Sequence, residues 1–418
     1  MPEEFSEGSA KIVKEENTFF NPAQKLNRDL SAEVIKTYFS GKENIKILTA
    51  MSATGLRGIR YLNEIPNSTL FFNDICPKAV EAIQENLKYN GIDTFKIFSE
   101  HENIKEYKHR ANVTRNDCHV LMNRFHSFFD VIDIDPFGSC AEFVNSAFKA
   151  IRHNGLICFT CTDKAALCTN EAKCYMRYST LIKKIFCKNE TPIRALLSYI
   201  SREFSKYDAR ILPVLSLSVD FYVRVIVRVY KGQGKSVLKD NSHFYICECM
   251  NILELPPGGT NTNCCAHCGK KMKLYGPFWN KELHDSQIID NIISSVSEAS
   301  NERMIGILKL MRQELPTMFY YEVPKLASFL KINCCKLSDV MTGLANAGHL
   351  VSLTHCDNNA FKTNAPIDVI KSLMVELNSK ALVSFSLSKN ISVDNIFAQN
   401  FYKGKIKSGL KPLSLPKK

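Results

Sequence analysis

The segment best suited to chemistry is DIDPFG at residues 133–138. It follows the apolar run 128–132, which predicts a buried strand, and Pro136 must end that strand because proline has no N–H to donate. The strand end therefore presents the Asp135 carboxylate, the Pro136 carbonyl and the Phe137 ring together. A carboxylate accepts hydrogen bonds from an amine, and an aromatic ring stacks on a planar base. An ordinary strand exit with a helix cap would explain the same residues, so the segment does not decide by itself.

Length and composition indicate a folded protein of two or three domains. The chain has 418 residues, of which 45% are hydrophobic and 23% are charged. No apolar run reaches the roughly 18 residues that a membrane helix needs. The acidic start at Met1–Glu4 has no apolar signal core. We therefore expect an intracellular protein of the nucleus, the cytoplasm or both, with no membrane partner.

Charge and cysteine content add two expectations. The formal net charge is +12, from 54 basic and 42 acidic residues, which suits a polyanionic partner, although a merely soluble basic protein would have the same balance. The 16 cysteines occur in a chain without a signal peptide, so we expect reduced thiols, some of them holding a metal, and not disulfides.

Strands and helices must position the segment around Asp135. Apolar strands at 45–48, 70–72, 112–114 and 155–160 alternate with helical patterns and flank the strand at 128–132. Such alternation predicts parallel βαβ units, whose ligands bind at the carboxyl ends of the strands. The later stretch 222–229 alternates apolar and polar residues, which predicts a half-buried antiparallel strand at or near the sheet edge.

Several strand ends carry polar residues. The turn Ser52–Gly55 (SATG) allows close approach of a ligand to the backbone and opens a helix whose N-terminus favours an anion. Asp74 ends the next strand, where an acid would hold ribose hydroxyls, and Asp117 follows the strand after it. Together with Asp135 these ends predict an S-adenosylmethionine site. A dinucleotide site is disfavoured because the chain lacks Gly-x-Gly-x-x-Gly.

At this point the chain resembles a known family, the tRNA guanine-26 N2-dimethyltransferases. The acid-proline-aromatic turn is also similar to the signature of methyltransferases that act on exocyclic amines. The matching blocks run in order through nearly the whole chain: FFNP at 19–22, NRDL at 27–30, SATGLRGIR at 52–60, NDI at 73–75, DIDPFG at 133–138, DFYVRV at 220–225, GPFW at 276–279 and FKTNAP at 361–366.

The resemblance implies an α/β fold: a Rossmann-like class I methyltransferase domain, followed by a C-terminal α+β domain with a zinc knuckle and a winged-helix-like unit. It implies that S-adenosylmethionine is held by Arg28, Arg57 and Asp74, with Asp117 and Cys118 around its adenine. We place the methyltransferase domain at residues 1–240.

The resemblance also implies how the acceptor is held. Asp135 would be the catalytic acid/base with the Pro136 carbonyl beside it, and Phe19 and Phe137 would hold the guanine. A guanine inside a stem cannot reach such a site, so the base must be flipped out. The predicted activity is transfer of methyl groups to guanine N2 in tRNA, most simply two of them at position 26.

One position departs from the family pattern. Thr49 stands where the family usually has an acid before the Ser52–Gly55 turn, and a hydroxyl there could reach the donor only through water. This motivates an alternative: a catalytically weak or inactive tRNA-binding or folding factor that keeps the fold. A third interpretation, an rRNA or DNA amine methyltransferase, is disfavoured because the C-terminal blocks match as well.

A cysteine cluster predicts a structural zinc site. The CxxC pair is followed by glycine, as zinc knuckles prefer, whereas the other half is CxC, one residue shorter than usual. The resemblance implies CxxC there too, so Met250 stands where a ligand would be expected. Cys264 and His267 are candidate substitutes, and buried free thiols are the alternative. The predicted ligands are Cys247, Cys249, Cys265 and Cys268.

The remaining chain is expected to engage tRNA. Helical patterns at 325–330 and 337–347 and a strand at 350–353 are similar to a winged-helix module, within a C-terminal domain placed at 241–400. Residues 401–418 contain six lysines and no acid, which predicts a basic tail. No protein partner is implied, and we expect a monomer.

Overall fold

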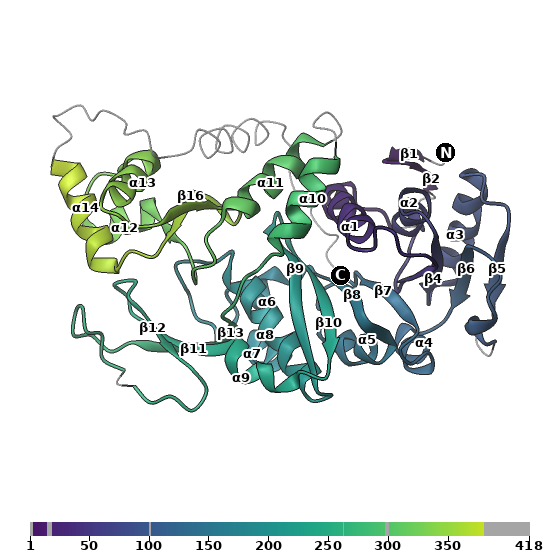
Figure 1. Cartoon of the computed structure of the whole chain (residues 1–418), viewed down its shortest axis with the longest axis horizontal. Helices are drawn as coiled ribbons and strands as arrows, with labels where there is room; N and C mark the ends of the chain where they lie inside the picture. Colours follow the sequence, from purple (N-terminus) through teal and green to yellow (C-terminus); the bar gives the residue numbers. More distant parts are fainter. Residues whose placement is uncertain (1–2, 15–18, 100–101, 262, 297–300, 380–418) are drawn as a thin grey trace, which may run out of the picture. The chain divides into compact units, whose positions relative to one another are not determined.

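A mixed eight-stranded sheet carries the segment around Asp135 (Figure 1). The computed structural model describes residues 3–14, 19–99, 102–261, 263–296 and 301–379, so the predicted tail at 401–418 lies outside the described residues. In spatial order the strands are β5 (Phe95–Phe98), β6 (Ala111–Arg115), β4 (Ser68–Asp74), β3 (Ile45–Thr49), β7 (Phe129–Ile134), β8 (Ile151–Cys161), β10 (Tyr222–Lys231) and β9 (Ala209–Val219).

The order of the strands creates a switch point beside Asp135. The chain starts at β3, moves outward through β4 to β5 and β6, and returns to place β7 on the other side of β3. All pairings from β5 to β8 are parallel, so the carboxyl ends of these strands share one edge. Ligands of open α/β sheets bind where the strand order reverses, here between β3 and β7.

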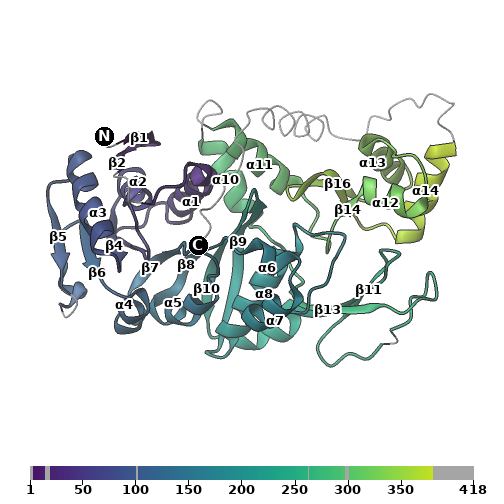
Figure 2. The ribbon, with the colours of Figure 1, turned by 180° about the vertical axis from the view of Figure 1, so that it is seen from behind.

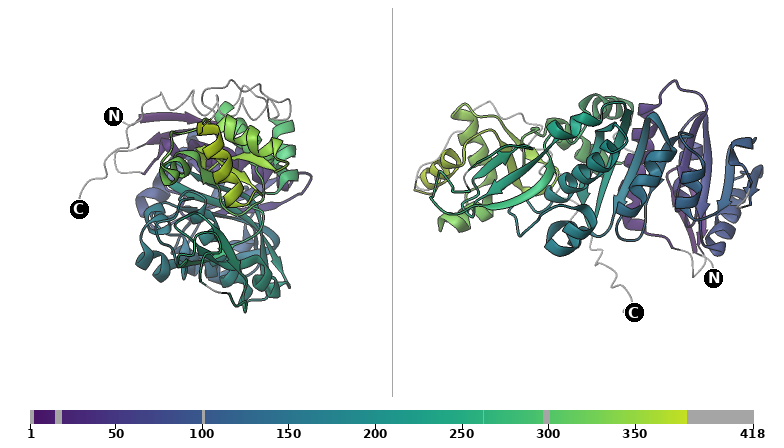
Figure 3. Two further views of the ribbon diagram at one scale, coloured as in Figure 1. Left: turned by 90° about the vertical axis from the view of Figure 1, so that its left-hand side faces the viewer. Right: turned by 90° about the horizontal axis from the view of Figure 1, so that it is seen from below.

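Helices cover both faces of this sheet (Figures 1 and 3). Gly58 of α2 shows how closely they pack, because a Cβ there would lie 2.2 Å from the Phe72 ring of β4. One face holds α1 (Lys25–Tyr38), α2 (Leu56–Glu64) and α3 (Pro77–Tyr89); the other holds α4 (Cys118–Arg124), α5 (Val144–Ala150) and α8 (Thr191–Ser205). Shorter helices in this part are η1 (Pro22–Gln24), η2 (Ile104–Glu106), η3 (Ala141–Phe143), α6 (Lys164–Cys168), α7 (Glu171–Tyr178), η4 (Gly234–Ser236) and α9 (Val237–Asp240).

Strand β10 is antiparallel and second from the sheet edge, as predicted, but it is not half buried. The side chains of Tyr222, Arg224 and Ile226, expected on a solvent face, are all fully buried. Helix α8 packs on β10, and Arg224 donates to Ser31 of α1 at 2.8 Å, so both faces are covered. The prediction failed because Arg224 finds a buried carboxylate partner, Asp133, which alternation alone cannot reveal.

The predicted domain boundary after residue 240 is not where the structure divides. Two compact units separate at Ser294/Ser295, and the small sheet that follows residue 240 belongs to the first unit. It is bound there because Arg194 of α8, which is fully buried, donates to the carbonyls of Trp279 and Lys281 at 2.9 and 3.1 Å. In spatial order this antiparallel sheet is β12 (Ile252–Leu255), β11 (Asn241–Ile246) and β13 (Lys273–Trp279).

The N-terminal residues form a hairpin that the sequence did not predict, with β1 (Glu3–Glu7) antiparallel to β2 (Ala10–Lys14). Strand β1 has little apolar character, and it is held by ion pairs from Glu7 to Arg28 and Arg60. Tertiary charge pairing, rather than strand propensity, therefore fixes this segment.

The second unit contains the winged-helix arrangement that the sequence predicted. Its elements are, in chain order, α11 (Glu302–Gln313), β14 (Tyr321–Glu322), α12 (Val323–Leu330), α13 (Leu337–Asn346), β15 (Val351–Thr354), β16 (Asp357–Thr363) and α14 (Ile367–Ser379). The three strands pair antiparallel in the order β14-β16-β15, which adds β14 and β16 to the predicted strand, β15, and the two predicted helices. Helix α10 (Ser286–Ser295) precedes this unit. Among the described residues, no helix is both long and apolar enough to cross a bilayer.

Candidate active site

Asp135 follows β7 at the edge where the carboxyl ends of the strands meet. Its carboxylate accepts a short charge-assisted hydrogen bond from Nη2 of Arg57, which belongs to α2. Nη1 of Arg57 donates to Asn27 Oδ1 at 3.0 Å and lies 3.5 Å from Asp133 Oδ2. Burial alone would lower the pKa of Arg57, but the charges of Asp133 and Asp135 raise it. Arg57 is therefore a permanent cation that bridges two carboxylates.

Asp133 anchors this network from inside the protein. Its oxygens accept from Nη1 and Nη2 of Arg224 at 3.0 and 2.7 Å and from the Tyr61 hydroxyl at 2.6 Å. Burial raises the pKa of Asp133, but the Arg224 and Arg57 charges outweigh it and hold the pKa below its usual value. Asp133 was not predicted as a site residue, although a carboxylate two residues before Asp135 must share its face of the strand.

Two exposed aromatic rings lie together beside Asp135. The ring centroids of Phe19 and Phe137 are 4.7 Å apart with an interplanar angle of 77°. These side chains are 51% and 80% exposed, which is unusual for phenylalanine unless the rings contact a partner. Gly138 fixes the loop of Phe137, because its N–H donates to Thr162 Oγ1 at 2.8 Å and its carbonyl accepts from Thr162 N. The structure thus brings the two predicted guanine-holding residues together.

The predicted donor side begins at the Ser52–Gly55 turn. The Asp74 carboxylate accepts from Ala53 N at 2.9 Å and from Cys76 N at 3.0 Å, so it holds the turn against the end of β4. A carboxylate has further lone pairs, and Asp74 can still accept from a ligand. Thr49 is buried, and its hydroxyl lies 2.7 Å from Ser52 Oγ. Thr49 therefore helps to hold the conformation of the Ser52–Gly55 turn from the protein interior.

Asp117 and Cys118 lie at the next strand end. Oδ1 of Asp117 caps α4 by accepting from His119 N and Val120 N at 2.7 and 3.2 Å. Cys118 is buried, and burial raises the pKa of its thiol to about 12, so it offers a neutral surface. The Asn73 amide donates to the carbonyls of Ala50 and Asn116, which ties the ends of β3, β4 and β6 together.

Arg28 does not bind any of the carboxylates at the described strand ends but contacts the N-terminal hairpin. Its Nε and Nη2 bind the Glu7 carboxylate at 2.7 and 2.5 Å, and its Nη1 donates to the Asn21 carbonyl at 3.2 Å. Arg28 thereby links the N-terminal hairpin to the segment that carries Phe19. Its contact with the methyl donor stays a prediction.

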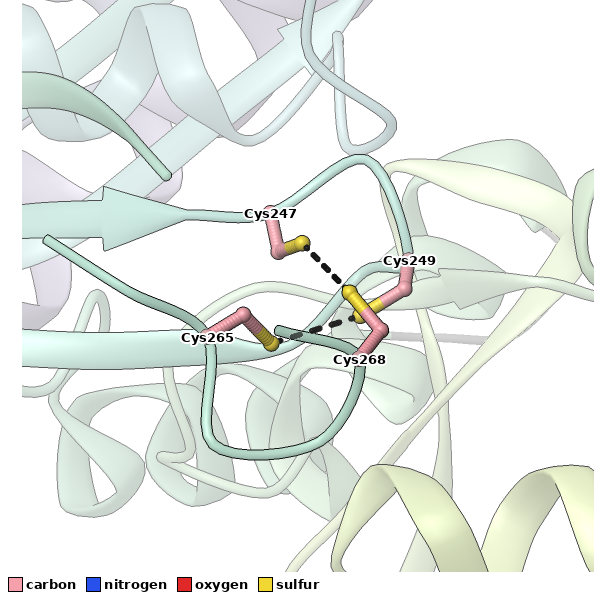
Figure 4. Close-up of side chains that lie close together, drawn as sticks. All are labelled: Cys247, Cys249, Cys265 and Cys268. Atoms are coloured by element: carbon pink, nitrogen blue, oxygen red, sulfur yellow. Dashed lines mark hydrogen bonds between the residues drawn. The ribbon is translucent and has the colours of Figure 1, made fainter. Parts of the chain in front are cut away.

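The cysteine cluster lies in two turns beside the small sheet of the first unit, one after β11 and one before β13 (Figure 4). The four predicted ligands, Cys247, Cys249, Cys265 and Cys268, each offer a sulfur, and all four sulfurs lie within 4.8 Å of one another. The Cys247–Cys268 and Cys249–Cys265 sulfur pairs are 3.4 and 3.7 Å apart. Tetrahedral Zn–S bonds of about 2.3 Å require sulfurs roughly 3.8 Å apart, so the residues fit a zinc ion.

The short CxC half-site closes because of its turn. Met250 adopts a φ of 67°, and Gly269 of the other half-site a φ of 71°, so Met250 takes the place of the glycine and not of a ligand. Cys247 N donates to Asn251 O at 2.9 Å, as Cys265 N donates to Lys270 O at 2.9 Å. The predicted substitutes Cys264 and His267 are exposed and are not needed to complete four ligands.

We expect the purified protein to contain one zinc per chain by elemental mass spectrometry. Cys265→Ser should lose the metal and lower the melting temperature, because three sulfurs cannot close a structural site. Cys264→Ser is the matched control, because it makes the same change at the adjacent residue and leaves Cys265 intact. This variant should keep the metal. A protein free of zinc in which both variants melt like wild type would favour buried free thiols instead.

The strand order, the helices on both faces and the acidic residues at the switch point define a class I, Rossmann-like methyltransferase fold, as predicted. Residues 3–375 match the family described as N2,N2-dimethylguanosine tRNA methyltransferase, and the chain belongs to this family. The resemblance found in the sequence is thereby confirmed.

Similar proteins align with most of the chain. A tRNA (guanine(26)-N(2))-dimethyltransferase of Caenorhabditis elegans is 30% identical over 87% of this chain and 78% of its own length. One from Methanobrevibacter smithii is 32% identical over 88% of this chain and 94% of its own. The solved structure of Trm1 from Pyrococcus horikoshii, a complex with S-adenosyl-L-methionine, is 28% identical with a TM-score of 0.78, and covers 88% of this chain and 99% of that chain.

Proposed function

We propose that this protein transfers methyl groups from S-adenosylmethionine to the exocyclic N2 of guanine in tRNA, and that it dimethylates guanosine at position 26. The observation that carries this proposal is the position of Asp135: it stands beside the exposed Phe19–Phe137 pair at the switch point of a methyltransferase fold. The Trm1 structure with bound S-adenosyl-L-methionine supports the same cofactor here.

The residues of the site address the main chemical difficulty of the reaction. The lone pair of guanine N2 is delocalised into the ring, so the amine is a poor nucleophile. Asp135 would accept a hydrogen bond from N2 and the Pro136 carbonyl a second, which favours a pyramidal nitrogen that can attack. The cofactor, when bound, supplies an electrophilic sulfonium methyl group. The N–C bond forms as the S–C bond breaks, and Asp135 accepts the proton that leaves N2.

The same arrangement can act twice. After one transfer the guanine N2 still carries a hydrogen, so once Asp135 has released its proton to solvent and a new donor has bound, Asp135 can accept again without a change of site. We propose that the Ser52–Gly55 turn, Arg57 and Asp74 hold the donor on one side of Asp135. Asp117 and Cys118 would lie at its adenine, and Arg28 would support this end of the site.

The decisive test is mass analysis of nucleosides from an unmodified tRNA transcript incubated with this protein and S-adenosylmethionine. We expect N2,N2-dimethylguanosine, mapped to position 26. Tight binding of the transcript without any methylated nucleoside would instead establish the non-catalytic tRNA-binding factor. Methylation of another base would overturn the proposed acceptor.

Phe137→Ala should raise the KM for tRNA by about 5- to 150-fold, because base–aromatic stacking contributes roughly 1–3 kcal/mol. Stability should change little, since the Phe137 ring is mostly exposed. Ile97→Ala is the matched control: Ile97 is also exposed but lies on β5, four strands from β7. If both variants had the KM of wild type, the Phe19–Phe137 pair would not hold the base.

We also propose that the second unit engages tRNA and that the protein acts as a monomer in the nucleus or cytoplasm. The net charge of +12 and the winged-helix arrangement support tRNA contacts beyond the acceptor site. Light scattering should give a mass near the 47.4 kDa of one chain. A stable dimer at micromolar concentration would contradict this.

A further inference from the structure

Helix α7 presents large apolar side chains to solvent. It directs Cys174 and Tyr178 inward, and both are fully buried. On its outer side Tyr175 is 57% and Met176 is 81% exposed. Neither side chain is required for the helix, because alanine is the better helix former at an exposed position. Two adjacent exposed apolar residues that folding does not require indicate contact with a partner.

Helix α7 is fixed to the loop that carries Asp135 and Phe137. The Tyr178 hydroxyl lies 2.7 Å from Ser139 Oγ, and Ser139 is two residues beyond Phe137. The same hydroxyl donates to the Asp163 carboxylate at 2.9 Å, and Arg177 binds that carboxylate at 2.8 Å. Tyr175 precedes Tyr178 by three residues, so the exposed side chains lie on the same short helix that Tyr178 fixes to this loop. Figure 2 shows α7 beside α6 and α8 in the first unit.

The segment that carries α7 is rich in basic residues, one of which, Arg177, is paired with Asp163. Between residues 164 and 188 the only acidic residue is Glu171, whereas the basic ones are Lys164, Lys173, Arg177, Lys183, Lys184 and Lys188. Lys173 is exposed on α7 itself, and Glu171 is already paired with Lys183 at 3.4 Å. Apolar side chains within a basic surface are complementary to nucleic acid, which offers flat bases and phosphates together.

We propose that the exposed face of α7 binds the tRNA next to the guanine that is methylated. Tyr175 and Met176 pack on the bases that the flipped guanine leaves unstacked, and Lys173 contacts the phosphate backbone. This inference rests on the proposed function, because it takes the flipped guanine at Phe137 as its reference point. The physical reason is that extrusion of a base exposes the apolar faces of its neighbours, and side chains that cover those faces lower the cost of extrusion.

The test compares the Tyr175→Ala/Met176→Ala variant with wild type for binding of an unmodified tRNA transcript by fluorescence anisotropy. We expect the Kd to rise by about 5- to 150-fold, the range given by loss of base stacking. Binding of S-adenosylmethionine by calorimetry should not change. The variant should fold, because alanine favours the helix and little buried surface is lost. Tyr175→Phe, which keeps the ring, should bind tRNA within about twofold of wild type.

Leu238→Ala is the matched control. Leu238 lies on α9 with 64% exposure, on a helix separate from α7. It should bind tRNA like wild type. Suppose that wild type methylates its transcript and that the double variant binds tRNA as tightly as Leu238→Ala. The proposal that α7 binds tRNA would then be wrong, while the proposed function would stand. If wild type transfers no methyl group, the proposed function fails, and the Kd values still decide whether α7 binds tRNA.

Discussion

Asp135→Ala should lower kcat for methyl transfer to tRNA by about 100- to 10,000-fold, the range of general acid–base contributions. Binding of tRNA and of S-adenosylmethionine should remain within a few-fold of wild type. The reason is that Asp135 acts on the guanine amine, and its acceptor oxygens matter most when the nitrogen attacks. Single-turnover rates at saturating donor, together with equilibrium binding of each substrate, separate these effects. Asp135→Asn keeps the shape and an acceptor oxygen but cannot take the proton, so its rate should fall as well.

The comparison with Asp74→Ala makes this prediction specific. Asp74 holds the Ser52–Gly55 turn through Ala53 N, so its loss should raise the Kd for S-adenosylmethionine first and spare the rate at saturating donor. The two variants should therefore have opposite patterns. If Asp135→Ala lost donor binding yet kept its rate at saturating donor, Asp135 would be a cofactor ligand, and the catalytic role would belong to another residue.

The strand ends were predictable from sequence because parallel strands place their carboxyl ends at one edge. Asp74, Asp117 and Asp135 each follow an apolar run, and that pattern is local. The strand order was not predictable in the same way. The structure places β3 between β4 and β7, so the Ser52–Gly55 turn separates Asp74 from Asp135.

The features that were predicted wrongly or not at all depend mostly on contacts between residues far apart in the chain. Arg224 and Asp133 are 91 residues apart, and without their pairing β10 has the alternation of a half-exposed strand. The β1–β2 hairpin depends on Glu7 reaching Arg28 and Arg60, which no local pattern contains. The CxC half-site was ambiguous because its closure requires Met250 to adopt a positive φ, a conformation more typical of glycine.

Asp133→Ala should destabilise the first unit by about 3–5 kcal/mol, measured as a shift in the urea unfolding curve. The cost is large because removal of one partner of a buried ion pair leaves an uncompensated charge. Arg224 is fully buried and would lose both of its bonds to Asp133, and Arg57 would keep Asp135 as its one carboxylate partner among the described residues. Activity should fall as well at temperatures where the variant is folded, because Arg57 is then free to shift and draw Asp135 from its position.

A double-mutant cycle separates the charge from the packing. Asp133→Ala combined with Arg224→Met removes the stranded cation and keeps an unbranched side chain in the same space. The double variant should therefore be more stable than Asp133→Ala alone, with a coupling free energy of roughly 0.5–3 kcal/mol. The Ser31 and Thr160 hydroxyls accept hydrogen bonds from Arg224 and would lose this donor in the Arg224→Met variant and in the double variant alike. The stability of the Arg224→Met single variant therefore measures this loss by itself. Strictly additive effects of the two substitutions would show that Asp133 and Arg224 do not act as a pair, and the support of Asp135 would then depend on Arg57 alone.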